Sequence, residues 1–221
     1  MKKDIIPPNT SNTTIIHSND GPTSVFWLDR NRKRTMKQKI QQKQFELRKK
    51  WHALWIKPNP HTMEETAAYI RKKYDFTELP KESKKYQRMY HEIRSSFIMQ
   101  YAPHLLGEYA ALPELKSRNE ADVKEFLDQM RLRQEKAANV PEEQFFIEFY
   151  VFEKEENDNH MELQLESHYG YIGGSASGTF ISKHHKILKD IYHYYGVSED
   201  DIRNHTKRYE DLLNRKSYKL L

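Results

Sequence analysis

Apolar side chains recur every three or four residues over several stretches of this chain, which is the pattern of amphipathic helices. The pattern is strongest after Pro80, where the apolar residues are Tyr86, Met89, Tyr90, Ile93, Phe97, Ile98 and Tyr101. Pro80 is expected to open this helix and Pro103 to close it, because proline lacks the N–H that continues a helix. We therefore expect this helix to lie in the core.

Residues that can cap a helix N-terminus mark the starts of four more helices. These predicted caps are Thr62, Asn119, Ser182 and Ser198. Thr62 and Ser198 are each followed three residues later by an acidic residue, which is the spacing of a capping box. The helix after Ser182 is expected to end at Gly196 in the left-handed conformation, and the helix after Ser198 to be the last one.

A long helix is also predicted from Asp29 to about Ile56, because this stretch has no Gly or Pro and is rich in Lys, Arg, Gln, Glu and Leu. Its apolar residues lie near spacings of three, four or seven and are Met36, Ile40, Leu47, Trp51 and Leu54. Such a narrow stripe is expected to pack on one neighbour and to leave the other faces of the helix in water.

Beyond residue 140 the pattern changes to that of strands. The stretch from Gln144 to Glu153 is dense in Phe, Ile, Tyr and Val, and apolar and polar residues alternate strictly over 161–166. Turn-forming residues at 156–159 separate the two, so an antiparallel hairpin is predicted. A flexible loop with a third short strand at Thr179–Ile181 is expected next, because glycines cluster at Gly170, Gly173, Gly174 and Gly178.

These patterns predict an α+β fold that is predominantly α-helical, with a C-terminal hairpin followed by two helices. Residues 1–23 are rich in Asn, Thr, Ser and Pro and lack apolar periodicity, so a flexible tail is expected there. Residues 24–139 are predicted to form a helical region that contains the long basic helix, and residues 140–221 an α+β region.

Composition limits the chemistry open to the chain. It has 221 residues and no cysteine, which excludes disulfide bonds, thiolate nucleophiles and cysteine-bound zinc. No run of about eighteen apolar residues is present, so a membrane-spanning helix is excluded. An acid and two prolines interrupt the N-terminal stretch that a signal peptide would need to be apolar. We therefore expect a cytoplasmic chain, and no motif in it calls for a cofactor.

Charge is distributed unevenly. Between Asp29 and Lys50 the cations outnumber the acids by ten to two, a balance of +8, whereas the whole chain carries +5 and the remainder therefore −3. The ten cations are Arg30, Arg32, Lys33, Arg34, Lys37, Lys39, Lys43, Arg48, Lys49 and Lys50. Cations spread along a helix suit contacts with phosphates, because each one releases counterions from the nucleic acid. These ten residues are the predicted nucleic-acid-binding set.

Other interpretations of the basic helix stay open. A charged helix can simply be solvated and docked on an acidic neighbour, and this is as well supported as a ligand site. A basic helix can also lie on an anionic membrane, but the narrow apolar stripe disfavours deep burial.

The predicted hairpin is the electrostatic opposite, with nine acidic residues between Glu142 and Glu166 and one cation, Lys154. It can dock against the basic helix, within the chain or between subunits. Alternatively, some of its side chains can bind a divalent metal, as in a metal-dependent nuclease. The residues proposed for that site are Glu148, Glu162, Glu166 and His168. Solubility alone is the simpler explanation of an acidic hairpin.

The glycine-rich stretch at residues 173–178 precedes a predicted helix, a placement that can favour phosphate binding. It lacks the order of residues of a phosphate-binding loop, so a connection between elements is the better explanation.

The sequence favours a non-enzymatic, nucleic-acid-associated protein that contacts phosphates through the basic helix, with no catalytic or metal-binding residues. The alternative is a protein-interaction or assembly module, in which the apolar seam of the helix or the edge of the hairpin meets a partner or a second copy. The metal-dependent nuclease is the third possibility.

Overall fold

The computed structural model describes most of the chain, namely residues 13–18, 21–27, 35–117 and 119–217. Over these residues the fold is α+β and predominantly helical, as the sequence predicts. The chain divides into two compact units, formed by residues 1–34 with 91–146 and by residues 35–90 with 147–221. We call the second of these the sheet unit and the first the helical unit.

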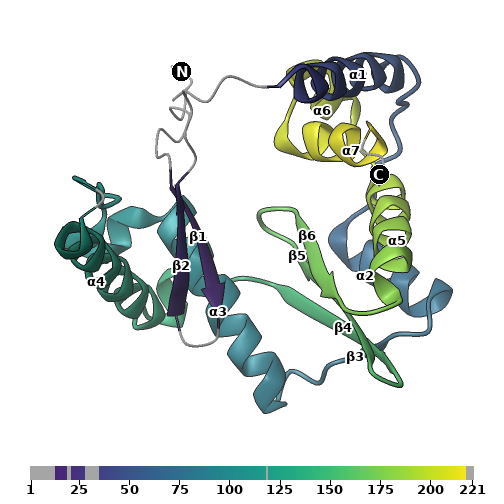
Figure 1. The fold of residues 1–221 in the computed structure, drawn as a ribbon. Helices are drawn as coiled ribbons and strands as arrows, with labels where there is room; N and C mark the ends of the chain where they lie inside the picture. The colour runs from purple at the N-terminus through teal and green to yellow at the C-terminus, as the bar shows by residue number, and fades with distance from the viewer. Residues whose placement is uncertain (1–12, 19–20, 28–34, 118, 218–221) are drawn as a thin grey trace. The chain divides into compact units, whose positions relative to one another are not determined.

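The sheet unit contains a four-stranded antiparallel sheet in the order β3-β4-β5-β6 (Figure 1). Its strands are β3 (Thr77–Glu78), β4 (Phe149–Glu156), β5 (Asn159–Glu166) and β6 (Tyr171–Ala176). The predicted hairpin is confirmed as β4 and β5, joined at a tight turn that places Glu156 opposite Asn159. The first strand begins at Phe149 rather than near Gln144, because residues 142–144 form a short 3₁₀ turn.

The third strand is not where the sequence analysis placed it. Instead of a glycine loop followed by a strand at residues 179–181, the glycines Gly173 and Gly174 lie inside β6. Gly174 has φ of +152°, and a Cβ there would lie 2.1 Å from the carbonyl oxygen of Glu162 on β5. Close approach of two strands, not loop flexibility, therefore requires glycine at this position.

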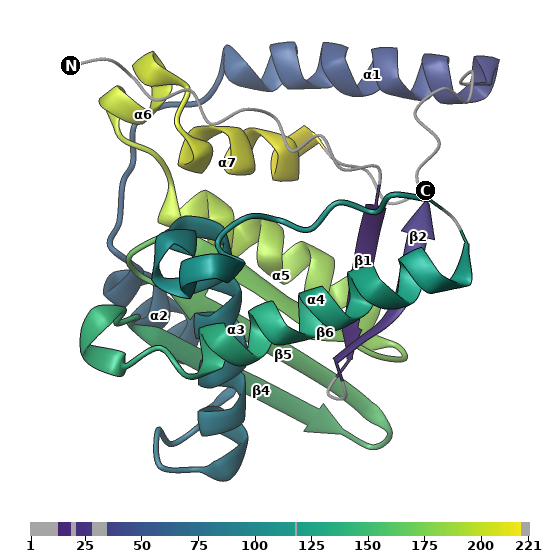
Figure 2. The same ribbon diagram turned by 90° about the vertical axis from the view of Figure 1, so that its left-hand side faces the viewer.

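Helices cover one face of this sheet in successive layers (Figure 2). Against the sheet lie α2 (Met63–Lys73) and α5 (Phe180–Tyr195), and α7 (Lys207–Ser217) packs on α5. The short α6 (Glu199–Asn204) precedes α7, and α1 (Met36–Ala53) packs on α7. Within the sheet unit, α1 is thus the layer farthest from the sheet.

The core of the sheet unit lies between the sheet and these helices. Tyr150 and Phe152 of β4 alternate with residues on the other face, and Leu163 and Leu165 lie opposite them on β5. The helices complete the core with Met63, Ala67, Ile70, Leu188, Ile191, Tyr192, Tyr195, Tyr209, Leu212 and Leu213. Buried residues alternate over 161–165 of β5, as the sequence pattern predicts. On β4, by contrast, Phe149 and Val151 are buried as well, and Tyr86 of α3 (Lys84–Tyr101) contacts Phe149.

Two of the predicted helix starts in this unit are confirmed. Thr62 and Ser198 are N-caps with complete capping boxes, in which Glu65 and Asp201 accept a backbone N–H in return. The last helix, however, is broken into α6 and α7. His205 has φ of 48° and ψ of 50°, a left-handed conformation that ends α6.

The start of α5 is also corrected. The helix begins at Phe180, not after Ser182, and Thr179 precedes it without a side-chain cap. The N–H of Thr179 instead donates to the side chain of Asn159 on β5 at 2.8 Å. The hairpin therefore determines where α5 begins. Gly196 ends the helix as predicted, but with φ of 60° and ψ of −161° it is not in the left-handed helical conformation that was expected.

The long basic helix is confirmed over Met36–Ala53, and Thr35 caps it in a capping box with Gln38. This cap was missed because the helix was expected to begin at Asp29. Residues 28–34 lie outside the described part of the chain, so the first part of that prediction remains a prediction.

The helical unit contains the end of α3 (Lys84–Tyr101), η1 (Pro103–Tyr109), α4 (Glu120–Ala138) and the 3₁₀ turn η2 (Glu142–Gln144). The predicted cap of α4 is confirmed, since Asn119 accepts the N–H of Asp122 at 2.8 Å. The expected start of α3 at Pro80 is wrong, because a turn at Pro80 precedes it. The hydroxyl of Ser83 accepts the N–H of Tyr86 instead.

Two buried arginines join the segments of the helical unit. Arg94 donates to the carbonyls of Val140, Pro141 and Phe145 at 2.7–2.9 Å. Arg133 donates to the carbonyls of Met99, Tyr109 and Ala110 at 2.9–3.3 Å. Their donors satisfy carbonyls that the ends of the helices leave free.

Two strands, β1 (Thr13–Ser18) and β2 (Gly21–Trp27), pair antiparallel in the same unit. They overlap the segment for which a tail was predicted. Across the described residues, none of the helices has both the length and the apolar character needed to cross a membrane.

Candidate functional site

The basic helix α1 is held on α7 by one of its faces. Phe45 is half-buried on this face, and Ala53 and Ile56 pack against the core. The guanidinium of Arg48 donates to the carbonyl of Ser217 at 3.1 Å, and the ammonium of Lys49 pairs with Glu210 at 2.5 Å. The last carbonyls of a helix lack intrahelical partners and carry partial negative charge, so Arg48 stabilises the end of α7.

The structure separates the ten predicted nucleic-acid-binding residues into three groups. Arg48 and Lys49 are half-buried against α7, as described above. The side chains of four others are exposed, and they are Lys37, Lys39, Lys43 and Lys50. The remaining four, Arg30, Arg32, Lys33 and Arg34, lie outside the described residues.

The apolar stripe of α1 does not pack on a neighbour, which contradicts the prediction. Its five residues, Met36, Ile40, Leu47, Trp51 and Leu54, are 51–77% exposed, and Trp55 beyond them is 66% exposed. These six make up most of the ten large hydrophobic side chains that are exposed in the described structure. The prediction failed because the side of α1 that carries Arg48 and Lys49 contacts α7 instead, while Ala53 and Ile56 pack against the core.

The acidic hairpin does not neutralise α1. Its carboxylates and its lysine find partners nearby, in the ion pairs Lys85–Glu153, Asp75–Lys154, His160–Glu155 and His160–Glu162. Within the described ranges, none of its acidic residues pairs with a cation of α1. The turn of the hairpin lies at the other end of the sheet unit from α1 (Figures 1 and 2).

Two of the residues proposed for a metal site lie together, since Nδ1 of His168 is 3.2 Å from the carboxylate of Glu166, whereas Glu148 and Glu162 have other partners. Glu166 is fully buried, and its carboxylate accepts the N–H groups of His168 and Tyr169 at 2.9 and 2.8 Å. Glu148 accepts the hydroxyl of Tyr150 at 2.7 Å, and this hydrogen bond lowers the pKa of Glu148. Glu162 belongs to a different cluster. Glu166 therefore orders the β5–β6 turn, and the proposed set does not form one site.

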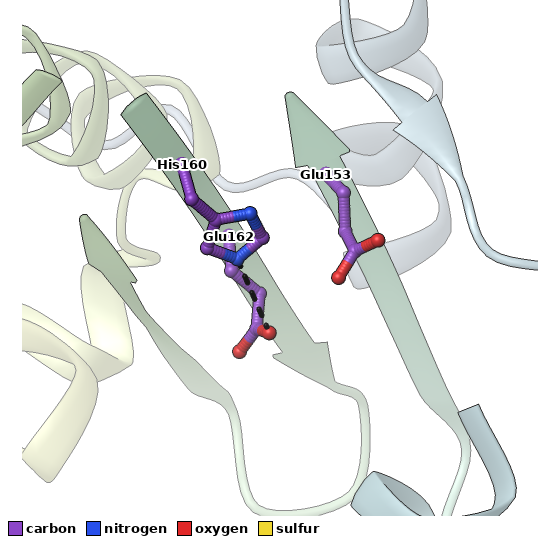
Figure 3. Close-up of side chains that lie close together, drawn as sticks. All are labelled: Glu153, His160 and Glu162. Atoms are coloured by element: carbon purple, nitrogen blue, oxygen red, sulfur yellow. Dashed lines mark ion pairs between the residues drawn. The ribbon is translucent and has the colours of Figure 1, made fainter. Parts of the chain in front are cut away.

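A different set of possible metal ligands lies together on the hairpin (Figure 3). One donor atom from each of Glu153, His160 and Glu162 lies within 4.8 Å of the others. Glu153 on β4 is directly opposite Glu162 on β5, and His160 is two residues from Glu162 on the same face. Glu153 and His160 are not among the residues predicted from the sequence. A two-residue turn at 157–158 would have given this register.

The carboxylates of this cluster already have partners within the chain. Glu153 pairs with Lys85 of α3, and the amide of Gln164 donates to Glu162 at 2.6 Å. Like charges directly opposite each other destabilise a sheet, and these two partners offset that repulsion. The cluster is thereby explained as part of the sheet surface.

A third polar cluster joins α2 to α5. The carboxylate of Asp190 accepts the hydroxyls of Tyr69 and Tyr74 at 2.7 and 2.6 Å and the ammonium of Lys73 at 2.8 Å. Burial acts to raise the pKa of Asp190, but the hydrogen bonds from Lys73 and the two tyrosines outweigh it, so this pKa is lowered. The ring of Tyr69 also stacks on Tyr194 of α5 at 3.8 Å. These contacts connect the two helices that cover the sheet.

Comparison of the chain with models of known families, with curated proteins and with solved structures gave no match in any of the three. The candidate site therefore depends on the geometry of α1 itself. It consists of the four exposed lysines and of the apolar stripe beside them.

Proposed function

We propose that this chain is a non-enzymatic protein that associates with nucleic acid, and that α1 is the element that contacts it. The observation that carries the proposal is that four lysines of α1 are exposed and have no carboxylate partner in the part of the chain that the structure describes. Lys37, Lys39, Lys43 and Lys50 are exposed, and none of them forms an ion pair with another described residue. A lysine without a carboxylate partner can exchange its counterion for a phosphate.

The spacing of these lysines supports contact along a backbone. Lys39, Lys43 and Lys50 lie four and seven residues apart, so they follow one side of the helix. Ammonium groups bind phosphates as point charges, and phosphate contacts carry no sequence information, so binding is expected to be largely independent of sequence. The proposal therefore concerns DNA and RNA alike.

The test is a gel shift with duplex DNA and duplex RNA of mixed sequence, repeated between about 50 and 200 mM salt. The intact chain should bind at the lower salt concentration and weaken as salt increases. The variant that combines Lys39→Gln, Lys43→Gln and Lys50→Gln should bind more weakly, and its log–log salt slope should be smaller by about one for each lysine removed.

The matched control changes three exposed lysines of the same unit that lie outside α1, in the combined variant Lys72→Gln, Lys81→Gln and Lys84→Gln. It removes the same net charge and should retain the slope of the intact chain. Absence of binding at low salt, or equal losses in the two variants, would reject α1 as the contacting element.

Assembly through a sheet edge is the second candidate function. The strand β6 lies at the edge of the sheet, with β5 as its neighbour in the sheet order. An edge strand can pair with a strand of another chain through free backbone groups. Light scattering tests this candidate, because a strict monomer at high protein concentration would remove it.

A further inference from the structure

The apolar stripe of α1 is not needed for contact with phosphates, and the proposal above leaves it without a role. At about 100° per residue, its five residues and Trp55 cover an arc of about 100° around the helix. Phe45 and Ile56, on the side that meets α7, lie on the opposite arc. The stripe thus points away from the rest of the sheet unit.

Cations border this stripe. Lys39, Lys43 and Lys50 follow one of its edges, and Lys37 lies on the other. Over Met36–Ala53 the helix has six cations and one glutamate, a balance of +5. A helix with this arrangement presents an apolar surface and a positive rim to the same side.

We propose that α1 is an interfacial helix, which lays its apolar stripe on an anionic lipid surface while the bordering lysines reach the headgroups. This goes beyond the association with nucleic acid, because it uses side chains that phosphate contacts do not need. Helices that lie in the plane of a membrane combine Trp and Leu on one face with Lys and Arg around it. Trp51 and Trp55 supply rings that favour the boundary between headgroups and acyl chains.

Charge complementarity selects this occupant over a second copy of the chain. Pairing two α1 helices along the stripe would bring two balances of +5 together, and Lys43 and Lys50 would border the shared seam on both sides. An anionic bilayer supplies the opposite charge instead, and each lysine near it contributes to binding. The long stems of these lysines can also lie along the apolar surface while the ammonium groups stay in water.

The layer order of the sheet unit suits a planar partner. Since α1 is the layer farthest from the sheet, its stripe can meet a flat surface while α7 holds the opposite face of the helix (Figure 2). The narrow stripe predicted from the sequence disfavours deep burial in a membrane. In the structure Trp55 widens the stripe, and all six residues are 51–77% exposed, as shallow insertion at the headgroups requires.

The test measures sedimentation of the full chain with vesicles of phosphatidylcholine, with and without phosphatidylserine. We expect binding to the vesicles that contain phosphatidylserine and little binding to phosphatidylcholine alone. Changing Leu47→Gln and Leu54→Gln together should lower the partition coefficient roughly tenfold for each leucine, about the loss of one transferred leucine side chain. Both leucines are exposed, so the variant should fold normally.

The matched control is Leu112→Gln with Leu132→Gln, which removes two exposed leucines from the helical unit. It should bind anionic vesicles as the intact chain does. Three results would overturn the proposal: no binding to anionic vesicles, equal losses in the two variants, or a dimer in light scattering that Leu47→Gln with Leu54→Gln converts to a monomer. The last result would assign the stripe to a second copy.

Gel shifts on the same variants separate binding to lipid from the proposed binding to nucleic acid. The change at Leu47 and Leu54 should leave the affinity for nucleic acid within about twofold, because neither side chain carries charge. The combined lysine variant should weaken both kinds of binding, with roughly fivefold lower partition for each lysine. Loss of vesicle binding alone therefore identifies the stripe, and loss of both vesicle binding and nucleic-acid binding identifies the lysines.

Discussion

The basic helix α1 and the acidic hairpin of β4 and β5 are the two most highly charged regions of the sheet unit. They differ in whether their charged side chains have partners within the protein. The hairpin pairs its charges locally, as in Lys85–Glu153 and Asp75–Lys154, and it buries Glu166 among backbone N–H groups. On α1, Lys49 has a carboxylate partner and Arg48 has a carbonyl, whereas Lys37, Lys39, Lys43 and Lys50 remain exposed.

The apolar residues of the hairpin and of α1 also differ in whether they are covered by the rest of the protein. The hairpin buries Phe152, Leu163 and Leu165 in the core, whereas α1 leaves Leu47 and most of its stripe exposed. Charges and apolar groups that are satisfied inside the unit stabilise the fold. Those left open on α1 are available to a ligand, and an exposed apolar group of this kind is typical of interaction surfaces.

The largest effect on stability is expected at the buried carboxylate of the hairpin. Glu166→Ala removes the buried acceptor of two backbone N–H groups and leaves a cavity in its place, which should lower the free energy of unfolding by about 3 kcal/mol. Urea unfolding measures the loss. The control Glu156→Ala changes an exposed glutamate of the same hairpin and should cost less than about 0.5 kcal/mol. Similar losses in both variants would contradict the assignment of Glu166.

An intermediate effect is expected from acidification of the helices behind α1. Burial, together with nearby cations such as Arg215 and Lys189, lowers the pKa of His52, His184 and His185. The unfolded chain therefore binds protons more readily than the folded chain. The contribution of the three neutral histidines to the free energy of unfolding is complete above about pH 6.5 and decreases as the pH falls below it.

Urea unfolding between about pH 7 and 5.5 measures this loss while most carboxylates stay charged. His184→Gln should flatten the dependence, because one of the shifted groups is removed. Stability that stays constant or increases on acidification would contradict the effect of burial.

A smaller effect is expected where α1 meets α7. Arg48→Ala removes the donor to the carbonyl of Ser217 and the half-buried stem, so the free energy of unfolding should fall by about 1 kcal/mol. Lys50→Ala, two residues further along α1, is the control and should change it by less than about 0.5 kcal/mol. If Lys50→Ala were the more destabilising change, the assignment of faces on α1 would be wrong.

The smallest effect on stability is expected for the exposed lysines. The combined Lys39→Gln, Lys43→Gln and Lys50→Gln variant should stay within about 0.5 kcal/mol of the intact chain, since exposed charges without partners contribute little to folding. Thermal unfolding checks this. A loss of several kcal/mol would mean that these lysines are structural, and the contrast with the hairpin would disappear.

The sequence by itself determined the elements whose causes are local. Thr62 and Ser198 start helices because their hydroxyls accept an N–H three residues away, and the residues needed for this lie within one turn. The alternation along β5 likewise determined that Met161, Leu163 and Leu165 are buried, because side chains alternate between faces of a strand. The excess of cations on α1 was also evident without coordinates.

Only the tertiary structure decided what depends on contacts between distant segments. Asn159 determines the start of α5, and the end of α7 determines which face of α1 is covered. Helical periodicity gives the position of an apolar stripe around a helix, but two faces of α1 can pack, and periodicity does not say which one does. Contact with α7 covers the side of Phe45 and exposes the side of Leu47.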